Sequence, residues 1–144
     1  ERGRAVRGKV SLDDMVIDVR AAVRELAKTG GKVGVVGYCM GGTVAWLAAT
    51  RIDGVAAAVG YYGGGIAAAA GEPPRCPVML HFGETDQSIP KEHYEKVRAL
   101  HPRIPVHVYP AGHGFSCDER GSYHEASARL ARERTLEFLR QHIG

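Results

Sequence analysis

The chain has 144 residues, 44% of them hydrophobic, and a formal net charge of +3 at pH 7. This length and composition favour one packed domain spanning 1–144. The basic residues are scattered. The densest run, 129–134, includes an acidic residue and lies on an expected helix, so nucleic-acid binding is not expected. No apolar stretch approaches the ~20 residues of a membrane span, and no secretory signal is visible.

The three cysteines lie at 39, 76 and 117, an odd number without the spacing of a disulfide framework. We therefore expect free thiols and a reducing, cytoplasmic environment. The spacing does not match a zinc site either, so we expect no metal. The Gly63-Gly64-Gly65 run lacks the Lys-Ser/Thr pair of a phosphate loop, so we do not interpret it as a phosphate-binding site.

Short apolar runs alternate with amphipathic stretches along the chain. Residues 1–9 are basic and contain glycine, and we expect no regular structure there. Ser11 and Asp14 are typical of a capped helix start, and Gly30 of a helix end. The expected elements are a helix at 11–29, strands at 32–36, 55–59, 77–82 and 105–109, and helices at 43–50, 90–100 and 123–142. This alternation predicts an α/β fold with about four parallel strands flanked by helices.

A glycine-flanked cysteine stands between the first strand and the second helix. Gly37-Tyr38-Cys39-Met40-Gly41 fits the pattern Gly-x-nucleophile-x-Gly, in which a strained turn raises the nucleophile above the strand. We expect the flanking glycines to be needed because side chains there would collide with the neighbouring strand and helix. The following helix N-terminus favours a thiolate, and the Met40 N–H would be an oxyanion donor. A buried cysteine that serves only packing is the alternative.

Two further polar residues follow strands. Asp86 comes after the strand at 77–82, and His113 after the strand at 105–109. Carboxyl ends of parallel strands meet at one edge, so both should lie near Cys39. The order nucleophile, acid, base suits an acyl-transfer triad in which His113 is the base and Asp86 orients it. Taken singly, Asp86 also fits a turn cap and His113 a solvated loop. Glu84 is a rival acid.

Other polar residues have weaker claims. Cys76 precedes a proline at a strand start and is interpreted as structural, and His81 within an apolar strand as a core histidine. Tyr62 fits either a pocket wall or core packing. Cys117 fits either a pocket wall or a loop thiol.

Four segments resemble the dienelactone hydrolase family: Gly-Tyr-Cys-Met-Gly-Gly at 37–42, Ala-Val-Gly-Tyr-Tyr-Gly at 58–63, His-Phe-Gly-Glu-Thr-Asp at 81–86 and Ala-Gly-His-Gly-Phe at 111–115. The resemblance extends from about Ser11 to Ile143. It implies an α/β-hydrolase fold and cofactor-free hydrolysis of an activated lactone or ester. The catalytic residues that it implies are Cys39, Asp86 and His113, with Met40 at the oxyanion position and Tyr62 in the pocket.

The chain departs from the family pattern in three respects. Cys117 stands where the best-known members carry an arginine for the substrate carboxylate, although Arg120 lies close by. Ser88 stands where they carry an aromatic residue. These four positions, Tyr62, Ser88, Cys117 and Arg120, are the expected pocket residues. The family's N-terminal half is absent from this chain, so we expect an unpaired edge at the 32–36 strand, completed by a further segment or a second chain.

The leading hypothesis is a thiol-dependent esterase or lactonase that acts on a small molecule through a thioester. One alternative is an incomplete or non-catalytic fragment, which the departure at the N-terminal half favours. Others are a general carboxylesterase with a different substrate, or an amidase or peptidase, which the glycine-flanked cysteine alone permits.

Overall fold

The computed structural model describes residues 2–144, apart from the side chains of Arg2, Arg4 and Arg7. Its elements in chain order are α1 (Arg2–Arg7), α2 (Leu12–Ala27), β1 (Val33–Tyr38), α3 (Met40–Arg51), β2 (Val55–Tyr61), α4 (Ile66–Ala69), β3 (Val78–Gly83), α5 (Lys91–Leu100), β4 (Val106–Tyr109) and α6 (Glu125–Ile143). The expectation of no regular structure over the first nine residues is wrong, because Arg2–Arg7 form one short helix. Glu1 lies outside the described residues.

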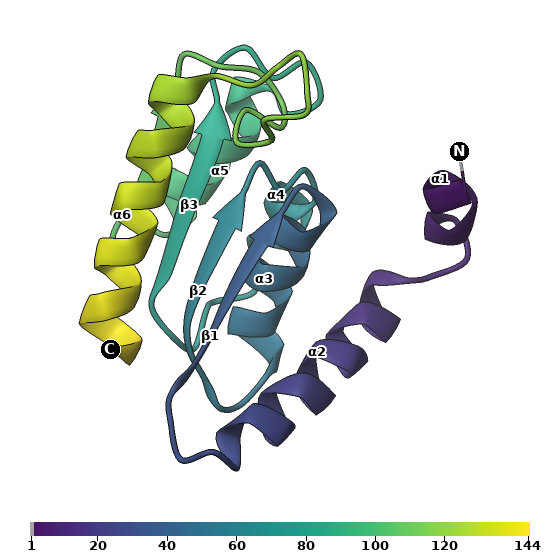
Figure 1. Ribbon diagram of the computed structural model, residues 1–144, viewed down its shortest axis with the longest axis vertical. Helices are drawn as coiled ribbons and strands as arrows, with labels where there is room; N and C mark the ends of the chain where they lie inside the picture. Colours follow the sequence, from purple (N-terminus) through teal and green to yellow (C-terminus); the bar gives the residue numbers. More distant parts are fainter. Residues whose placement is uncertain (1) are drawn as a thin grey trace.

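The four strands form one parallel sheet in the order β1-β2-β3-β4. Helix α6 covers one face, while α3 and α5 cover the other and α2 packs outside α3 (Figure 1). Strand β2 is apolar and almost entirely buried, as expected for a strand between two helical layers. The predicted α/β architecture with four parallel strands is confirmed.

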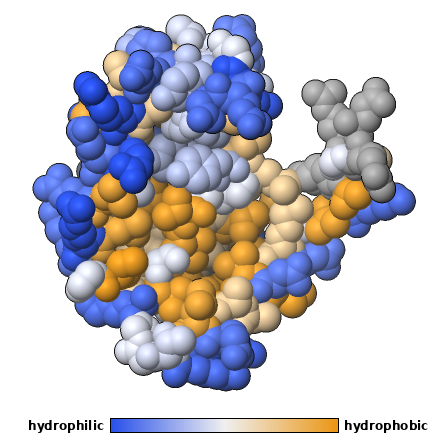
Figure 2. Space-filling model, viewed as in Figure 1, coloured by the Kyte–Doolittle hydropathy of each residue, from blue (hydrophilic) through white to orange (hydrophobic). Residues whose placement is uncertain are grey.

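Strand β1 lies at the edge of the sheet, and β2 is its only strand neighbour within residues 2–144. The expectation of a buried strand at 32–36 is only partly right, because Lys32 and Val36 are exposed. Tyr38, which ends β1, is exposed too. Figure 2 shows hydrophobic side chains gathered in the middle of the face that both figures turn to the viewer, where Figure 1 draws β1. Completion of the sheet by another segment or chain stays a prediction.

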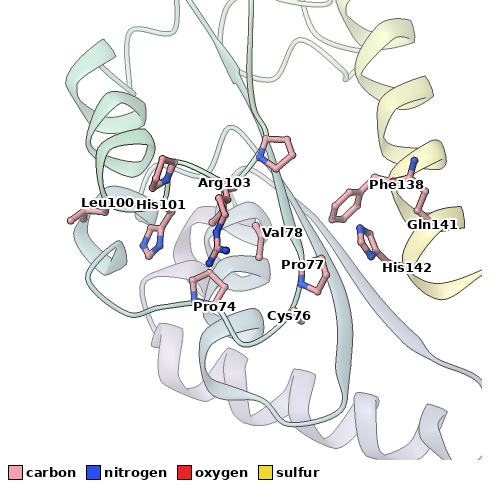
Figure 3. Close-up of a pocket in the computed structure, with 13 residues that line it drawn as sticks. Pro74, Cys76, Pro77, Val78, Leu100, His101, Arg103, Phe138, Gln141 and His142 are labelled. Atoms are coloured by element: carbon pink, nitrogen blue, oxygen red, sulfur yellow. The ribbon is translucent and has the colours of Figure 1, made fainter.

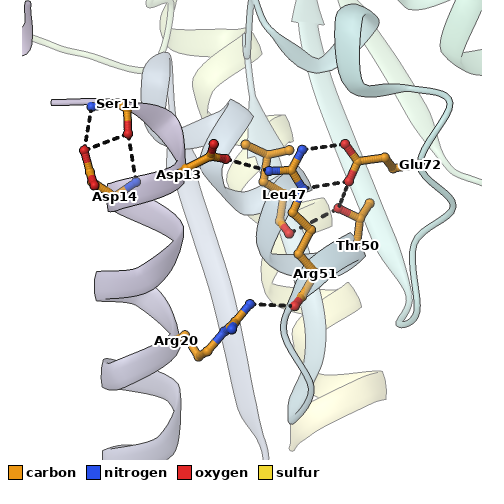
Figure 4. A network of polar contacts seen from close by, with 8 residues as sticks. All are labelled: Ser11, Asp13, Asp14, Arg20, Leu47, Thr50, Arg51 and Glu72. Carbon is orange, nitrogen blue, oxygen red and sulfur yellow. Dashed lines mark hydrogen bonds and ion pairs between the residues drawn. The ribbon is translucent and has the colours of Figure 1, made fainter.

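Helix α2 is joined to α3 by a network of ion pairs. Ser11 and Asp14 form the expected capping box, with a Ser11 Oγ to Asp14 N distance of 3.0 Å. Arg51 at the end of α3 binds Asp13 of α2 and Glu72 beyond α4 (Figure 4). Local capping and this network together fix the first turn of α2 against α3. Within residues 2–144, no helix is long and apolar enough to cross a membrane.

Candidate active site

Cys39 lies at the tight turn from β1 into α3. Its φ of 54° and ψ of −116° are strained for a residue with a side chain. The turn is held because the Cys39 N–H donates to the Tyr61 carbonyl at 2.9 Å and the Cys39 carbonyl accepts from Gly42 N at 2.9 Å. The thiol is exposed at the carboxyl end of the sheet, as the sequence pattern predicts.

The turn depends on close backbone approaches at two glycines. A Cβ at Gly37 would lie 1.8 Å from the Gly41 carbonyl oxygen, and one at Gly42 would lie 2.5 Å from the Tyr61 carbonyl oxygen. A Cβ at Gly41 would meet nothing within 4 Å. The expectation that both flanking glycines are sterically required is therefore right for Gly37 and wrong for Gly41. Gly42 carries the second steric requirement.

His113 lies between an acid and the thiol. Its Nδ1 is 2.7 Å from Asp86 Oδ2, and its Nε2 is 3.1 Å from Cys39 Sγ. These three side chains come from loops after β4, β3 and β1, so the shared strand ends bring them together. A histidine with a carboxylate on one ring nitrogen and a thiol on the other can move a proton to and from sulfur.

The carboxylate that contacts His113 belongs to Asp86. Its side chain has no exposed surface, whereas that of His113 is 23% exposed. The Ser88 N–H donates to Asp86 Oδ1 at 2.8 Å, so each carboxylate oxygen has a partner. Glu84, the rival acid, is an exposed residue whose backbone N–H donates to the Tyr109 carbonyl. Asp86 is therefore the acid positioned to orient the imidazole.

Met40 is the first residue of α3, where backbone N–H groups lack partners inside the helix. Its amide follows Cys39 directly, at the helix start beside the thiol. This position suits the stabilisation of a negative oxygen on a carbon bonded to Sγ.

A cleft of about 370 Å³ opens beside the thiol. It is lined by Leu12, Cys39, Met40, Thr43, Gly64, Gly65, Ser88, Ile89 and His113. Of the four expected pocket residues, Ser88 is part of this lining. Tyr62, Cys117 and Arg120 are not.

The other three expected pocket residues have different surroundings. Tyr62 is buried and its ring centroid lies 5.2 Å from that of His113, so it packs beneath the base. Burial raises the pKa of Tyr62 to about 12. Cys117 is half-buried in a turn, with its N–H bonded to the Gly114 carbonyl. The Arg120 side chain covers Gly114.

The comparisons with known proteins agree with this architecture. The model of the dienelactone hydrolase family matches residues 1–143. This chain belongs to the dienelactone hydrolase family.

Individual relatives and solved structures are also similar to this chain. The carboxymethylenebutenolidase of Pseudomonas putida is 37% identical over 131 residues, covering 85% of this chain and 55% of the relative. A crystal structure of a provisionally assigned dienelactone hydrolase from Klebsiella pneumoniae has a TM-score of 0.82 at 29% identity, covering 94% of this chain and 64% of that one. An esterase of Pyrococcus furiosus has a TM-score of 0.73 at 17% identity, covering 92% and 63%, which shows the fold alone. The chain spans about half the length of the curated relatives it matches.

Sequence reasoning missed two apolar residues of the cleft in this family member. Leu12 starts α2, and Ile89 follows Ser88 in the loop before α5. Both are brought to the thiol by packing between segments far apart in sequence, so no local motif marks them. Their only sequence signals are an apolar residue just after a helix cap and another just after the Asp86 loop.

A second, larger cavity of about 640 Å³ lies at the opposite end of the sheet, between the start of β3, the end of α5 and α6 (Figure 3). It contains Cys76, whose thiol pKa is raised to about 11 by burial. His101 lies there too, but its Nε2 contacts the Ala70 carbonyl oxygen at 2.7 Å rather than sulfur. Among the described side chains of this cavity, no hydrogen bond joins Cys76 to a base, and its structural role stays a prediction.

Proposed function

We propose that the protein hydrolyses activated esters or lactones, with Cys39 as nucleophile, His113 as base and Asp86 as the orienting acid. The observation that carries this proposal is the position of the His113 ring, 2.7 Å from a buried carboxylate and 3.1 Å from an exposed thiol. Such a pairing supplies both an activated nucleophile and a group that returns the proton.

The first chemical step is acylation of sulfur. Cys39 Sγ attacks the carbonyl carbon as its proton passes to His113 Nε2, and a C–S bond forms. The carbonyl oxygen becomes negative and accepts the Met40 N–H. When the C–O bond to the leaving group breaks, His113 returns the proton to that oxygen. The products are an alcohol and a thioester on Cys39. For a lactone, the alcohol stays attached to the acyl group.

The second step regenerates the thiol. His113 takes a proton from water, whose oxygen attacks the thioester carbon, and the C–S bond breaks as sulfur regains the proton. Asp86 holds the imidazole with Nε2 toward sulfur and stabilises the imidazolium that forms in both steps. The Ser88 N–H fixes the carboxylate through its other oxygen, so the imidazole keeps its orientation throughout.

The substrate class follows from the family and from the cleft. The curated relatives include carboxymethylenebutenolidases, which supports a small ester or lactone. Cys117 and Ser88 occupy positions where the family resemblance implies an arginine and an aromatic residue, and among the side chains that the structure describes no lysine or arginine lines the cleft beside Cys39. These observations favour a lactone or ester other than dienelactone, and faster turnover of dienelactone than of p-nitrophenyl acetate would contradict this.

The test compares Cys39→Ala with Cys117→Ala, a control that removes a thiol outside the cleft. We expect Cys39→Ala to lower kcat/KM for p-nitrophenyl acetate at least ~10³-fold, as loss of a covalent nucleophile does. Cys117→Ala should stay within about twofold. Equal activity of both variants would contradict the proposal. Turnover of amides instead of esters would favour an amidase. No turnover, together with no labelling of Cys39 by a thiol-reactive ester, would favour the non-catalytic alternative.

A further inference from the structure

The cleft beside Cys39 continues along helix α3. A second hollow of about 410 Å³ adjoins it, and Leu12, Thr43 and Gly65 line both. The second hollow is further lined by Asp13, Leu47, Arg51, Ala68, Ala69 and Glu72. The two hollows share these three lining residues and follow one another between α2, α3 and α4, and we call them together the α3 trough. It starts at the thiol and ends at Arg51.

Apolar residues, or residues with small side chains, line the α3 trough along most of its length. Gly64, Gly65 and two of the three alanines of α4, Ala68 and Ala69, contribute no side chain beyond a methyl group. The Thr43 hydroxyl is already used, since it accepts the Gly65 N–H at 3.0 Å. A Cβ at Gly65 would lie 2.7 Å from Thr43 Cγ2, so this position stays small. Such walls favour hydrocarbon over polar groups.

The far end of the trough carries charge that is already neutralised. Arg51 Nε lies 2.7 Å from Glu72 Oε2, and its Nη1 lies 2.9 Å from Asp13 Oδ1 (Figure 4). Two carboxylates therefore bind Arg51, which is the cationic side chain among the described residues that line the trough. A substrate carboxylate placed there would meet Asp13 and Glu72 as like charges.

The chemistry fixes which part of the substrate enters the trough. His113 returns the proton to the leaving oxygen, so the leaving group lies on the His113 side of the reacting carbon. His113 lines only the hollow beside Cys39. The acyl chain, bonded to the same carbon, then extends away from His113 over Thr43 toward Leu47.

The length of the trough sets the length of the chain. Cys39, Thr43 and Leu47 follow at intervals of four residues, so they are neighbours along one side of α3. Eight residues at a rise of 1.5 Å each span ~12 Å. At ~1.5 Å per C–C bond, a chain of about eight carbons has that contour length.

We propose that the α3 trough binds an uncharged aliphatic acyl chain of about six to eight carbons, with Leu12 as the residue that sets chain-length preference. This inference rests on the proposed function and names its substrate class. Leu12 lies where the two hollows meet. Its position is fixed on both sides, by the Ser11 capping box and by the ion pair of Asp13 with Arg51.

The experiment measures kcat/KM for p-nitrophenyl acetate, hexanoate and octanoate and for mono-p-nitrophenyl adipate, which has six carbons and a terminal carboxylate. Acylation of Cys39 is followed in parallel by mass spectrometry. The variants are Leu12→Trp, which fills the junction, and Ala68→Trp, which fills the far hollow from an exposed position of α4. The matched control is Ile17→Trp, an exposed position of α2 that lines neither hollow.

We expect hexanoate to exceed acetate at least ~10-fold, since each buried methylene favours binding by up to about fourfold. The kcat/KM for mono-p-nitrophenyl adipate should be at least ~10-fold lower than that for p-nitrophenyl hexanoate. Both trough variants should remove the hexanoate advantage, and Ile17→Trp should keep it. If the esters acylate Cys39 but the series is flat, or neither trough variant changes it, the trough assignment is wrong while the proposed function stands. If no ester acylates Cys39, the proposed function and this inference both fail.

Discussion

Two histidines of this protein have hydrogen bonds at both ring nitrogens, yet their surroundings differ completely. His113 contacts a carboxylate and a thiol at the open end of the sheet. His81 lies in the middle of β3 with no exposed surface, its Nδ1 2.8 Å from the Tyr109 hydroxyl and its Nε2 3.0 Å from Thr135 Oγ1. Of these two histidines, only His113 has both a thiol and solvent within reach.

The partners of His81 form a closed network. Thr135 Oγ1 also contacts the Tyr61 hydroxyl at 2.6 Å, and Arg134 donates to the Tyr109 hydroxyl at 3.2 Å. One arrangement satisfies every group: Tyr109 donates to His81 Nδ1, and His81 Nε2–H donates to Thr135. This network joins α6 to β2, β3 and β4, and burial lowers the pKa of His81 to about 3. Paired hydrogen bonds orient both histidines. Exposure and a thiol partner are what would allow His113, and not His81, to transfer a proton during a reaction.

The largest expected effect separates the two histidines by activity. His113→Ala should lower kcat/KM for the best ester ~10³- to 10⁴-fold, since it removes the base and the proton donor together. Because His113 is partly exposed in a loop, the free energy of unfolding should change by less than about 1 kcal/mol. Steady-state kinetics and urea denaturation check both results. A variant that keeps a tenth of the activity would contradict the role of His113.

The next effect concerns Asp86, the carboxylate that contacts His113, whereas both partners of His81 are hydroxyl groups. Asp86→Asn should lower kcat about 10³-fold because the amide no longer stabilises the imidazolium or fixes its tautomer. Glu84→Gln is the matched control and should stay within about twofold. The reverse ranking, measured by steady-state kinetics, would assign the acid to Glu84 instead.

The third effect is on stability and belongs to His81. His81→Ala should lower the free energy of unfolding by about 3 kcal/mol, because it leaves a cavity and removes partners from the buried Tyr109 and Thr135 hydroxyls. Activity per folded molecule should stay within about threefold. Urea denaturation measures the loss. A variant of normal stability that has lost all activity would make His81 a functional residue and erase the distinction.

The smallest effect is the pH dependence that follows from the buried ring. The unfolded chain protonates His81 near its ordinary pKa of 6.5, whereas the folded chain does so only near 3. Between these values the unfolded state binds more protons, so stability falls as pH falls. From pH 7 to pH 5 the loss should be about 2 kcal/mol. His107, whose pKa is also lowered by burial, acts in the same direction.

His81→Gln removes the larger contribution to this pH dependence. Urea denaturation at pH 5 and pH 7 should therefore show a smaller difference for the variant than for the parent. An equal difference in both proteins would contradict the assignment to His81.

Local signals in the sequence predict Cys39, Asp86 and His113 better than they predict the residues that line the cleft around them. Glycines around Cys39 and the strand-end positions of Asp86 and His113 predict that the three residues lie together, because parallel strands end at one edge. Their catalytic roles stay predictions. The position of Leu12 depends on how α2 packs on α3, and Thr135 reaches His81 only through the packing of α6 on the sheet. Such long-range contacts leave no motif.

Two smaller differences between the sequence expectations and the structure also arise from contacts between segments far apart in the sequence. The pattern around Cys39 does not distinguish Gly41 from Gly42, because the clash that matters is with the Tyr61 carbonyl of the adjacent strand. Exposure of Val36 and Tyr38 depends on β1 being an edge strand, which composition alone does not reveal.

The most direct measurement is the mass of the protein after brief mixing with p-nitrophenyl hexanoate and acid quench. The proposed thioester mechanism predicts one added hexanoyl group, found by peptide mapping on Cys39 and absent in Cys39→Ala. It also predicts a burst of p-nitrophenol of matching size. Ester hydrolysis at the full rate with no acyl group on Cys39, or with the group on Cys76 or Cys117, would contradict it.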